Sequence, residues 1–163
     1  MSTAANTPFA RRPFGVNLIG HAFDVFGISE DIRMVARALA AAGVPFCVIN
    51  YPAANGAAST DRSLEPWLCT DPNGGPYVFN LVCMAAPIQA RWLRQCGLAP
   101  LRERYTVSEW PWEAQKWPHP WLPLLQVADE LWPASSFTAS AQARQAASLK
   151  KPLRIMELAA EID

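Results

Sequence analysis

The sequence predicts an α/β fold, in which a mostly parallel sheet of about six strands carries helices on both faces. Short apolar runs alternate along the chain with segments whose apolar residues recur at helical spacing. The apolar runs lack polar alternation, which is typical of parallel strands that are covered on both sides. At 163 residues, the chain has the length of one domain. We assign residues 13–163 to this domain and residues 1–12 to a flexible tail.

The first half of the chain predicts two strands with a helix between them. Residues 14–20 (FGVNLIG) form an apolar run that ends at a glycine, which indicates a strand. Ser29 is predicted to cap a helix that continues to Gly43, because apolar residues follow it at helical spacing. Residues 45–51 indicate a second strand. The stretch 52–75 is rich in Pro, Gly, Asn and Ser and predicts a long loop.

The second half predicts four more strands and two more helices. One helix is expected from Pro87 to about Gln95. An alanine-rich helix is expected to begin after Ser135 or Ser136 and to end near Ser148. The predicted strands lie at 77–83, at 104–110, within 129–135 and at 153–158.

Charge and cysteine usage narrow the class of protein. The 14 basic and 14 acidic residues give a net charge of zero, which disfavours nucleic acid and anionic membranes as partners. No apolar run reaches the roughly 18 residues that a membrane span needs, so no transmembrane segment is expected. The four cysteines are far apart, which favours free thiols and a cytoplasmic location. Arg11 and Arg12 resemble a twin-arginine export signal, but no long apolar segment follows them.

The sequence lacks the motifs of several common kinds of functional site. The two histidines, His21 and His119, lack partner ligands at short spacing, so neither a metal nor a cofactor is expected. No G-x-S-x-G elbow is present, which disfavours a hydrolase. Residues 20–31 (GHAFDVFGISED) fit neither G-x-G-x-x-G nor a P-loop, which disfavours a dinucleotide dehydrogenase.

Three loops are expected at one edge of the sheet, because parallel strands bind ligands beyond their carboxyl ends. These loops are 20–29, 83–87 and 109–121. The first leads into a helix N-terminus, which can bring backbone N–H groups to a ligand. Glu30 and Asp31 already occupy that positive end, and a plain turn before a capped helix is the alternative.

Residues 109–121 (EWPWEAQKWPHPW) hold four of the seven tryptophans. Prolines exclude a regular helix and a central strand here. The tryptophans either pack in the core or form a platform for a sugar ring or a second domain. We expect a division, in which some are core while Trp112 and Glu113 face a cleft. Glu109 and Glu113 could accept hydrogen bonds from hydroxyls, although Glu113 could also pair with Lys116 in solvent.

Three segments carry recognisable motifs: FGISEDIRMVARALAAAGVPFCVINYP, YTVSEWPWEAQKWPHPW and DELWPASSFTASA. Together they resemble the N-terminal half of bacterial family 4 glycosyltransferases, the retaining group with the GT-B fold. Many such enzymes carry a Gly-Glu-Asp helix start, a W-x-W-E-L-x-x-W-P segment and a "DE-W-x-x-S-x-F" strand-to-helix step. The resemblance covers nearly the whole chain from about Phe14, and the last two motifs are specific in combination.

The resemblance implies one of two facing Rossmann-like domains, the one that shapes the acceptor site. The other domain, absent from this chain, would hold a nucleotide-sugar donor and carry an E-x7-E pair. Transfer would retain the anomeric configuration and need no metal. The expected partners are therefore that donor and a glycan or lipid-linked acceptor, in the cytoplasm or at the inner face of the membrane. Without the donor domain, turnover is not expected.

The resemblance also implies which residues form the site. Glu113, at the W-x-W-E position, and Glu109 are expected to be catalytic. Ser29 stands where the family often has a second glycine, which stiffens the first loop. A non-enzymatic carbohydrate-binding domain and an interaction domain without a ligand are the alternatives. The expected substrate-binding residues are Gly20, His21, Phe26, Gly27, Ser29, Trp110 and Trp112.

Overall fold

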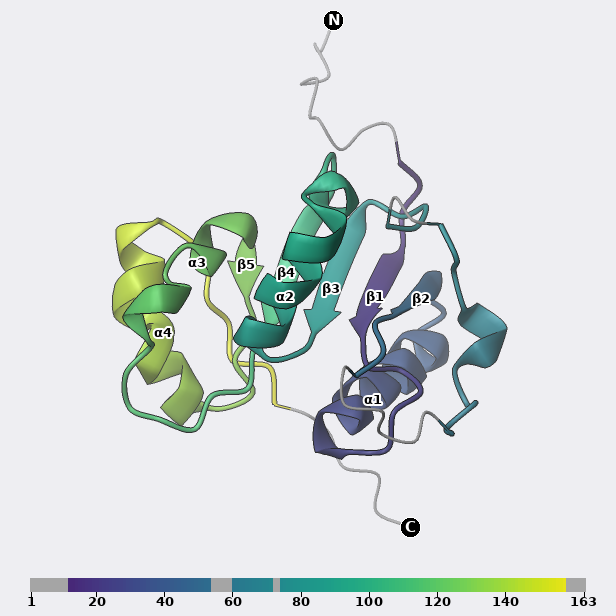
Figure 1. The fold of residues 1–163 in the computed structure, drawn as a ribbon, viewed down its shortest axis with the longest axis horizontal. Coiled ribbons are helices and arrows are strands. Elements are labelled where there is room, and N and C mark those ends of the chain that lie inside the picture. The colour runs from purple at the N-terminus through teal and green to yellow at the C-terminus, as the bar shows by residue number, and fades with distance from the viewer. Residues whose placement is uncertain (1–11, 54–59, 72–73, 158–163) are drawn as a thin grey trace, which may run out of the picture.

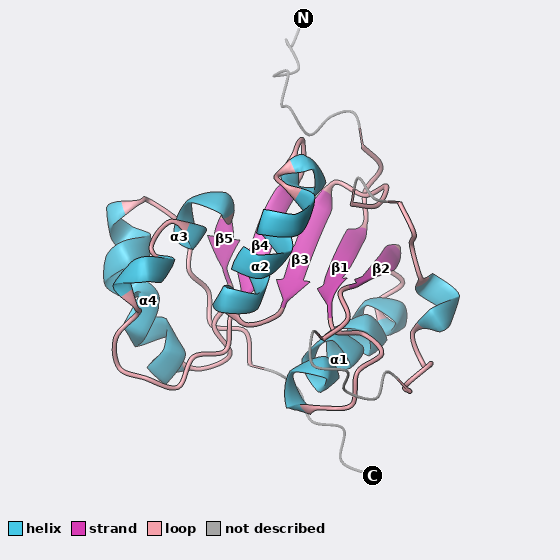
Figure 2. Cartoon of the chain, viewed as in Figure 1, coloured by secondary structure: helices cyan, strands magenta, loops and turns pink. Residues whose placement is uncertain are grey.

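The computed structural model describes residues 12–53, 60–71 and 74–157, and it contains one parallel sheet. Its strand order is β2-β1-β3-β4-β5, with helices packed against it (Figures 1 and 2). The predicted α/β fold with a parallel sheet is confirmed, with five strands in the described residues where about six were expected. The strands are β1 (Val16–Gly20), β2 (Phe46–Asn50), β3 (Phe79–Cys83), β4 (Tyr105–Glu109) and β5 (Glu130–Leu131).

Helices cover both faces of the sheet, as predicted. Successive residues of β1 point to opposite faces. Leu18 packs in a cluster with Ile32 of α1, whereas Ile19 packs with Trp92 of α2. A further cluster brings α2, α3 and α4 together with Leu131 of β5. We call the two sides the α1 face and the α2 face. The helices are α1 (Gly27–Ala41), α2 (Ala86–Cys96), α3 (Leu124–Val127) and α4 (Ser136–Ser148).

Strand β1 lies inside the sheet, between β2 and β3. The chain leaves β1 toward β2 on one side and later returns to β3 on the other, so the topological switch point lies between β1 and β3. Gly20 permits the close approach of these two strands, because a Cβ there would lie 2.5 Å from the backbone oxygen of Cys83. The fold therefore brings backbone close together at the place where such sheets bind ligands.

Two details of the predicted elements are wrong. Helix α1 begins two residues before Ser29, and its N-cap is Phe26 in an extended conformation. Ser29 is therefore a buried residue of the first turn, and its hydroxyl caps nothing. The predicted last strand is also absent over 153–157, where the chain forms a single bridge between Leu153 and Leu131. Strand β5 is only two residues long, so it offers a neighbour little to pair with.

Other expectations are met or lie outside the described residues. Ser135 caps α4 and accepts a hydrogen bond from the backbone N–H of Thr138 at 3.1 Å, as predicted. All four cysteines are free. Among the described residues, no helix is long and apolar enough to cross a bilayer. Residues 1–11 of the expected tail, parts of the expected loop at 52–75 and Leu158 lie outside the described residues.

Candidate functional site at the carboxyl edge of the sheet

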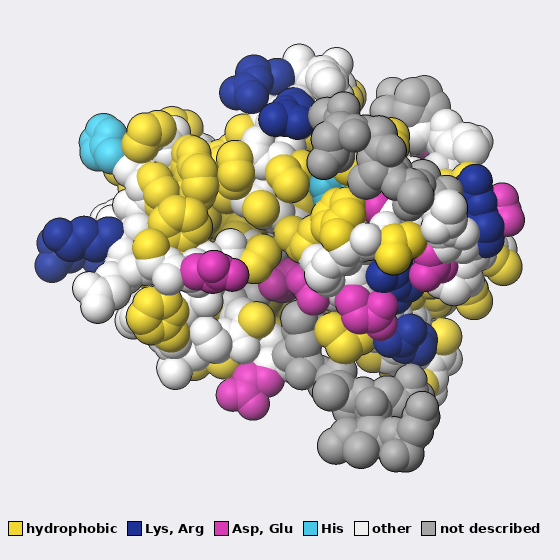
Figure 3. All heavy atoms as spheres, turned by 60° about the horizontal axis from the view of Figure 1, so that its bottom comes forward, with side chains coloured by type: hydrophobic (Ala, Val, Ile, Leu, Met, Phe, Trp, Pro, Cys, Tyr) yellow, Lys and Arg dark blue, Asp and Glu magenta, His cyan; other side chains and the backbone are white. Residues whose placement is uncertain are grey.

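The ends of three strands form one row. In the register of the sheet, Gly20 pairs with Cys83, and Cys83 pairs with Glu109. The loops that follow β1, β3 and β4 therefore start side by side, as predicted. We call this row and the loops after it the carboxyl edge. Figure 3 turns this edge toward the viewer and shows acidic side chains gathered across its middle, with hydrophobic side chains beside them.

Glu109 is the most unusual side chain of this edge. It is 3% exposed, and neither of its carboxyl oxygens has a hydrogen-bond partner among the described residues. Burial and, to a smaller extent, the negative charge of Asp31 together raise the pKa of Glu109 to about 8. At neutral pH the carboxyl group is therefore mostly protonated, and it can both donate and accept a hydrogen bond.

Asp31 forms a second acidic group near Glu109. It lies just after the first turn of α1 and is half-buried. Burial and, to a smaller extent, the charge of Glu30 together raise the pKa of Asp31 to about 6. Sequence reasoning assigned Asp31 only to the helix dipole, because nothing in the sequence shows that the start of α1 lies close to the end of β4. Two carboxyl groups with perturbed pKa values in one place are typical of a functional site.

His21 is buried just beyond β1. It is 2% exposed and packs against the rings of Phe26 and Tyr51, at centroid distances of 5.2 and 5.8 Å. Its Nδ1 atom lies 3.3 Å from Oδ2 of Asp24, although neither ring nitrogen forms a hydrogen bond with the described residues. Over the described ranges, no group of three or more His, Cys, Asp or Glu side chains is positioned to hold a metal ion.

The remaining loop residues differ in how accessible they are. Gly27 is exposed, and a Cβ there would meet no atom within 4 Å, so no close approach requires a glycine. The hydroxyl of Ser29 is buried and has no hydrogen-bond partner in the described part of the chain. Phe26 is half-buried against His21. The structure therefore brings Gly20, His21 and Phe26 together and leaves Gly27 at the surface.

The tryptophans of the loop pack mainly on one another. Trp110 and Trp117 stack with centroids 5.3 Å apart and are 1% and 5% exposed, which confirms that some of the four are core. Trp112 and Trp121 are half-buried and meet Trp117 edge-on. The indole N–H of Trp110 donates to Oε1 of Gln89 on α2. Trp110 thus has no ring face open to a sugar in this structure.

Glu109 and Glu113 have very different positions. Side chains alternate along a strand, so Glu109 points to the α1 face while the next residue, Trp110, points to the α2 face. Glu113 lies in the exposed loop beyond the strand and has no hydrogen bond or ion pair with the described residues. The structure brings Glu109 to the carboxyl edge and leaves Glu113 at the surface of the loop, so the catalytic role of Glu113 stays a prediction.

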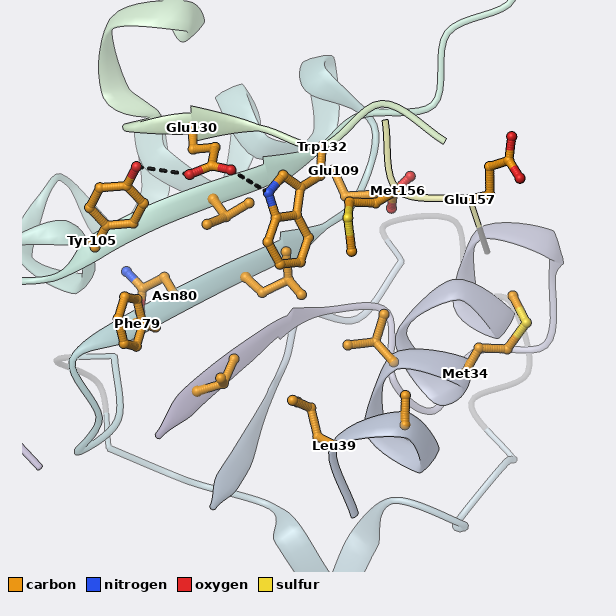
Figure 4. A pocket seen from close by; sticks show the side chains of 15 residues that line it. Met34, Leu39, Phe79, Asn80, Tyr105, Glu109, Glu130, Trp132, Met156 and Glu157 are labelled. Atoms are coloured by element: carbon orange, nitrogen blue, oxygen red, sulfur yellow. Dashed lines mark hydrogen bonds between the residues drawn. The ribbon is translucent and has the colours of Figure 1, made fainter. Parts of the chain in front are cut away.

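A groove on the α1 face leads to Glu109. Its volume is about 540 Å³. The sheet forms its floor, α1 forms one wall, and Met156 and Glu157 form the other (Figure 4). Figure 4 shows Glu109 beside Trp132 and Met156. The lining residues are Val16, Met34, Val35, Ala38, Leu39, Phe79, Asn80, Leu81, Tyr105, Val107, Glu109, Glu130, Trp132, Met156 and Glu157.

No protein-family model matches the chain, and neither a curated protein nor a solved structure matches it. The glycosyltransferase family that the motifs resemble therefore stays a prediction. It depends on the motifs of the sequence alone.

Proposed function

We propose that this chain is the acceptor-binding domain of a retaining glycosyltransferase, which moves a sugar from a nucleotide-sugar donor to a glycan or lipid-linked acceptor. The proposal rests on the surroundings of Glu109. It is a buried carboxyl group without a hydrogen-bond partner, in the row beside the switch point of a parallel sheet. Buried polar groups are normally hydrogen-bonded, so each exception needs an explanation, and a catalytic or ligand-binding role is one of them.

The positions of the motifs support this proposal. The segment that begins α1, the segment that ends β4 and the segment that contains β5 were the three that resembled the family. The first two meet at the carboxyl edge, where the charge of Asp31 acts on Glu109. An acceptor hydroxyl bound there would donate to one carboxyl oxygen of Glu109 and accept from the other.

The proposal leaves the donor to a second domain. Glu30 lies in the first turn of α1 and Asp31 follows it directly, and negative charge there opposes the binding of donor phosphates by this chain. Transfer is therefore expected only where a nucleotide-sugar domain faces this edge, in the cytoplasm or at the inner face of the membrane. The proposed chemistry needs no metal and no further cofactor.

A carbohydrate-binding domain without turnover was the alternative, and it relied on the tryptophans of the loop. Trp110 and Trp117 are stacked in the core, and the indole N–H of Trp112 donates to the backbone oxygen of Lys116 at 3.0 Å. The rings are thus engaged with one another and with the chain, which favours the transferase proposal over this alternative.

Ligand titration of the ¹⁵N-labelled chain tests the proposal. We expect sugars with free hydroxyls to shift backbone amide signals at Gly20, His21 and Glu109, and to leave those of α4 unchanged. Nucleotide sugars should bind no more tightly than the matching free sugars, because the donor belongs to the second domain. Tight binding of a nucleotide without a sugar, or sugar shifts confined to the tryptophan loop, would contradict the proposal.

A further inference from the structure

Among the described residues, no helix covers the part of the α1 face that lies over β4 and β5. Helix α1 packs near β1, while α2, α3 and α4 all lie on the other side of the sheet. The groove of about 540 Å³ occupies the remaining part, over β3, β4 and β5. This volume lies within the range of roughly 300–1,000 Å³ that is usual for sites that bind small molecules. Tyr105 and Val107 of β4 point into it, on the more apolar side of that strand.

Most polar side chains that line the groove are already engaged. Asn80 donates to the backbone oxygen of Pro100 and to Oγ1 of Thr106 at 3.0 and 3.2 Å. The side-chain oxygen of Asn80 accepts a hydrogen bond from Nδ2 of Asn17 at 2.9 Å. The hydrogen-bonding capacity of Asn80 is therefore used within the sheet.

Glu130 is engaged as well. It accepts hydrogen bonds from the hydroxyl of Tyr105 at 2.9 Å and from the indole N–H of Trp132 at 2.8 Å, as the dashed lines in Figure 4 show. The guanidinium group of Arg154 lies 2.9 Å from the same carboxylate. Glu157 is exposed at the rim and can be hydrated. Among the described lining residues, Glu109 is thus the buried polar side chain with unused capacity.

We propose that this groove binds an apolar alcohol, whose hydrocarbon body lies along the sheet and whose hydroxyl group forms hydrogen bonds with Glu109. The apolar lining matches a hydrocarbon body, and a single unpartnered carboxyl group matches a single polar head. A hydroxyl group has one donor and can accept in return, so one protonated carboxyl group satisfies it.

An ammonium head fits the groove less well than a hydroxyl head. An ammonium group has three donors, whereas the buried acceptors left unused by the described lining residues are the two oxygens of Glu109. It would also have to lose its water among apolar side chains, and removing a charged group from water is unfavourable. A carboxylate head would be repelled by Asp31, whose charge already acts on Glu109. The hydroxyl group is therefore the head that this site accommodates.

The inference rests on the groove and does not require sugar transfer. If the proposed function also holds, the bound alcohol is a lipid acceptor whose hydroxyl group lies at the carboxyl edge. Binding of an alcohol and transfer of a sugar are measured separately, so the failure of one proposal leaves the other open to its own test.

The test compares two probes of similar length by amide chemical-shift titration of the full chain. 1-Octanol has a hydroxyl group, whereas 1-methoxyheptane has an ether oxygen and no donor. We expect both to shift the signals of Leu81, Val107 and Trp132, and octanol to bind at least about tenfold more tightly, which is about the contribution of one buried hydrogen bond. Octylammonium should bind more weakly than octanol.

Two variants make the comparison specific. Glu109→Leu keeps the size of the side chain and removes its polar group, so octanol should lose its advantage over the ether. Glu157→Gln changes another residue of the same groove and should preserve that advantage. Equal binding of octanol and ether to the unaltered chain, or a preference for octylammonium, would overturn the proposal even if Glu109→Leu fails to fold. Absence of any shift in the groove would also overturn it and would leave this face to a protein helix.

Discussion

Replacing Glu109 by glutamine is expected to change how the stability of the protein depends on pH. The pKa of Glu109 is raised from 4.5 to about 8 in the folded protein, mainly by burial. Between these values the folded state holds a proton that the unfolded state has lost. The free energy of unfolding therefore falls as pH rises through this window, and the stabilisation is complete only below about pH 4.5.

The size of the effect follows from the same two pKa values. Each pH unit in the window changes the free energy of unfolding by about 1.4 kcal/mol. Between pH 5 and pH 8, the unaltered protein should lose on the order of 4 kcal/mol relative to Glu109→Gln. This is a large share of the roughly 5–15 kcal/mol that stabilises a typical domain. Asp31, whose pKa is raised to about 6, is present in both proteins and largely cancels in the comparison.

Urea denaturation, followed by tryptophan fluorescence at pH 5, 6, 7 and 8, measures the difference. Glutamine keeps the size and polarity of a protonated carboxyl group, so the difference between the two curves isolates the ionisation of Glu109. Glu113→Gln is the matched control, because its exposed side chain should leave the shape of the curve unchanged. Parallel curves for the unaltered protein and Glu109→Gln would refute the reasoning, since a solvated carboxyl group gives that result.

Two further predictions concern the elements that position the site. Gly20→Ala should destabilise the protein by about 1–3 kcal/mol, because its Cβ would lie 2.5 Å from the backbone oxygen of Cys83, whereas Gly27→Ala has free space and should cost nothing measurable. A similar loss for both variants in thermal unfolding would contradict the close approach. Ser135→Ala should lower the free energy of unfolding by about 1 kcal/mol, because α4 loses its cap. Ser136→Ala changes a residue in the first turn and should lower it much less. Equal losses for the two variants in urea denaturation would argue against the cap.

The strands and helices could largely be predicted from the sequence, because apolar runs and helical spacing reflect local burial. The start of α1 could not be predicted in this way. Ser29 followed by two acidic residues is a good capping signal, yet Phe26 adopts the extended cap conformation and packs its ring on His21. Tertiary packing thus prevailed over a local preference. The last strand failed for a similar reason, since pairing depends on the neighbouring strand and β5 ends at Leu131.

The candidate site was predicted only in part. The sequence placed both Glu109 and Glu113 in the segment at the end of the fourth predicted strand. The register of the sheet shows that Glu109 is the last residue of β4, paired with Cys83, and that Glu113 lies in the loop beyond it. Asp31 was missed because its proximity to Glu109 arises from the packing of α1 on the sheet. The groove was missed as well, since apolar strands predict that both faces are covered without showing which helix covers which strand.

The central claim is that Glu109, at the carboxyl edge, binds the acceptor hydroxyl. The most direct test is the rate of sugar transfer by a protein that carries this domain together with a nucleotide-sugar domain. Glu109→Leu should lower the rate by about a hundredfold or more without lowering the melting temperature, and Glu113→Leu should leave it within about twofold. Transfer by Glu109→Leu within about twofold of the unaltered rate, a change below roughly 0.5 kcal/mol in the barrier, would contradict the claim.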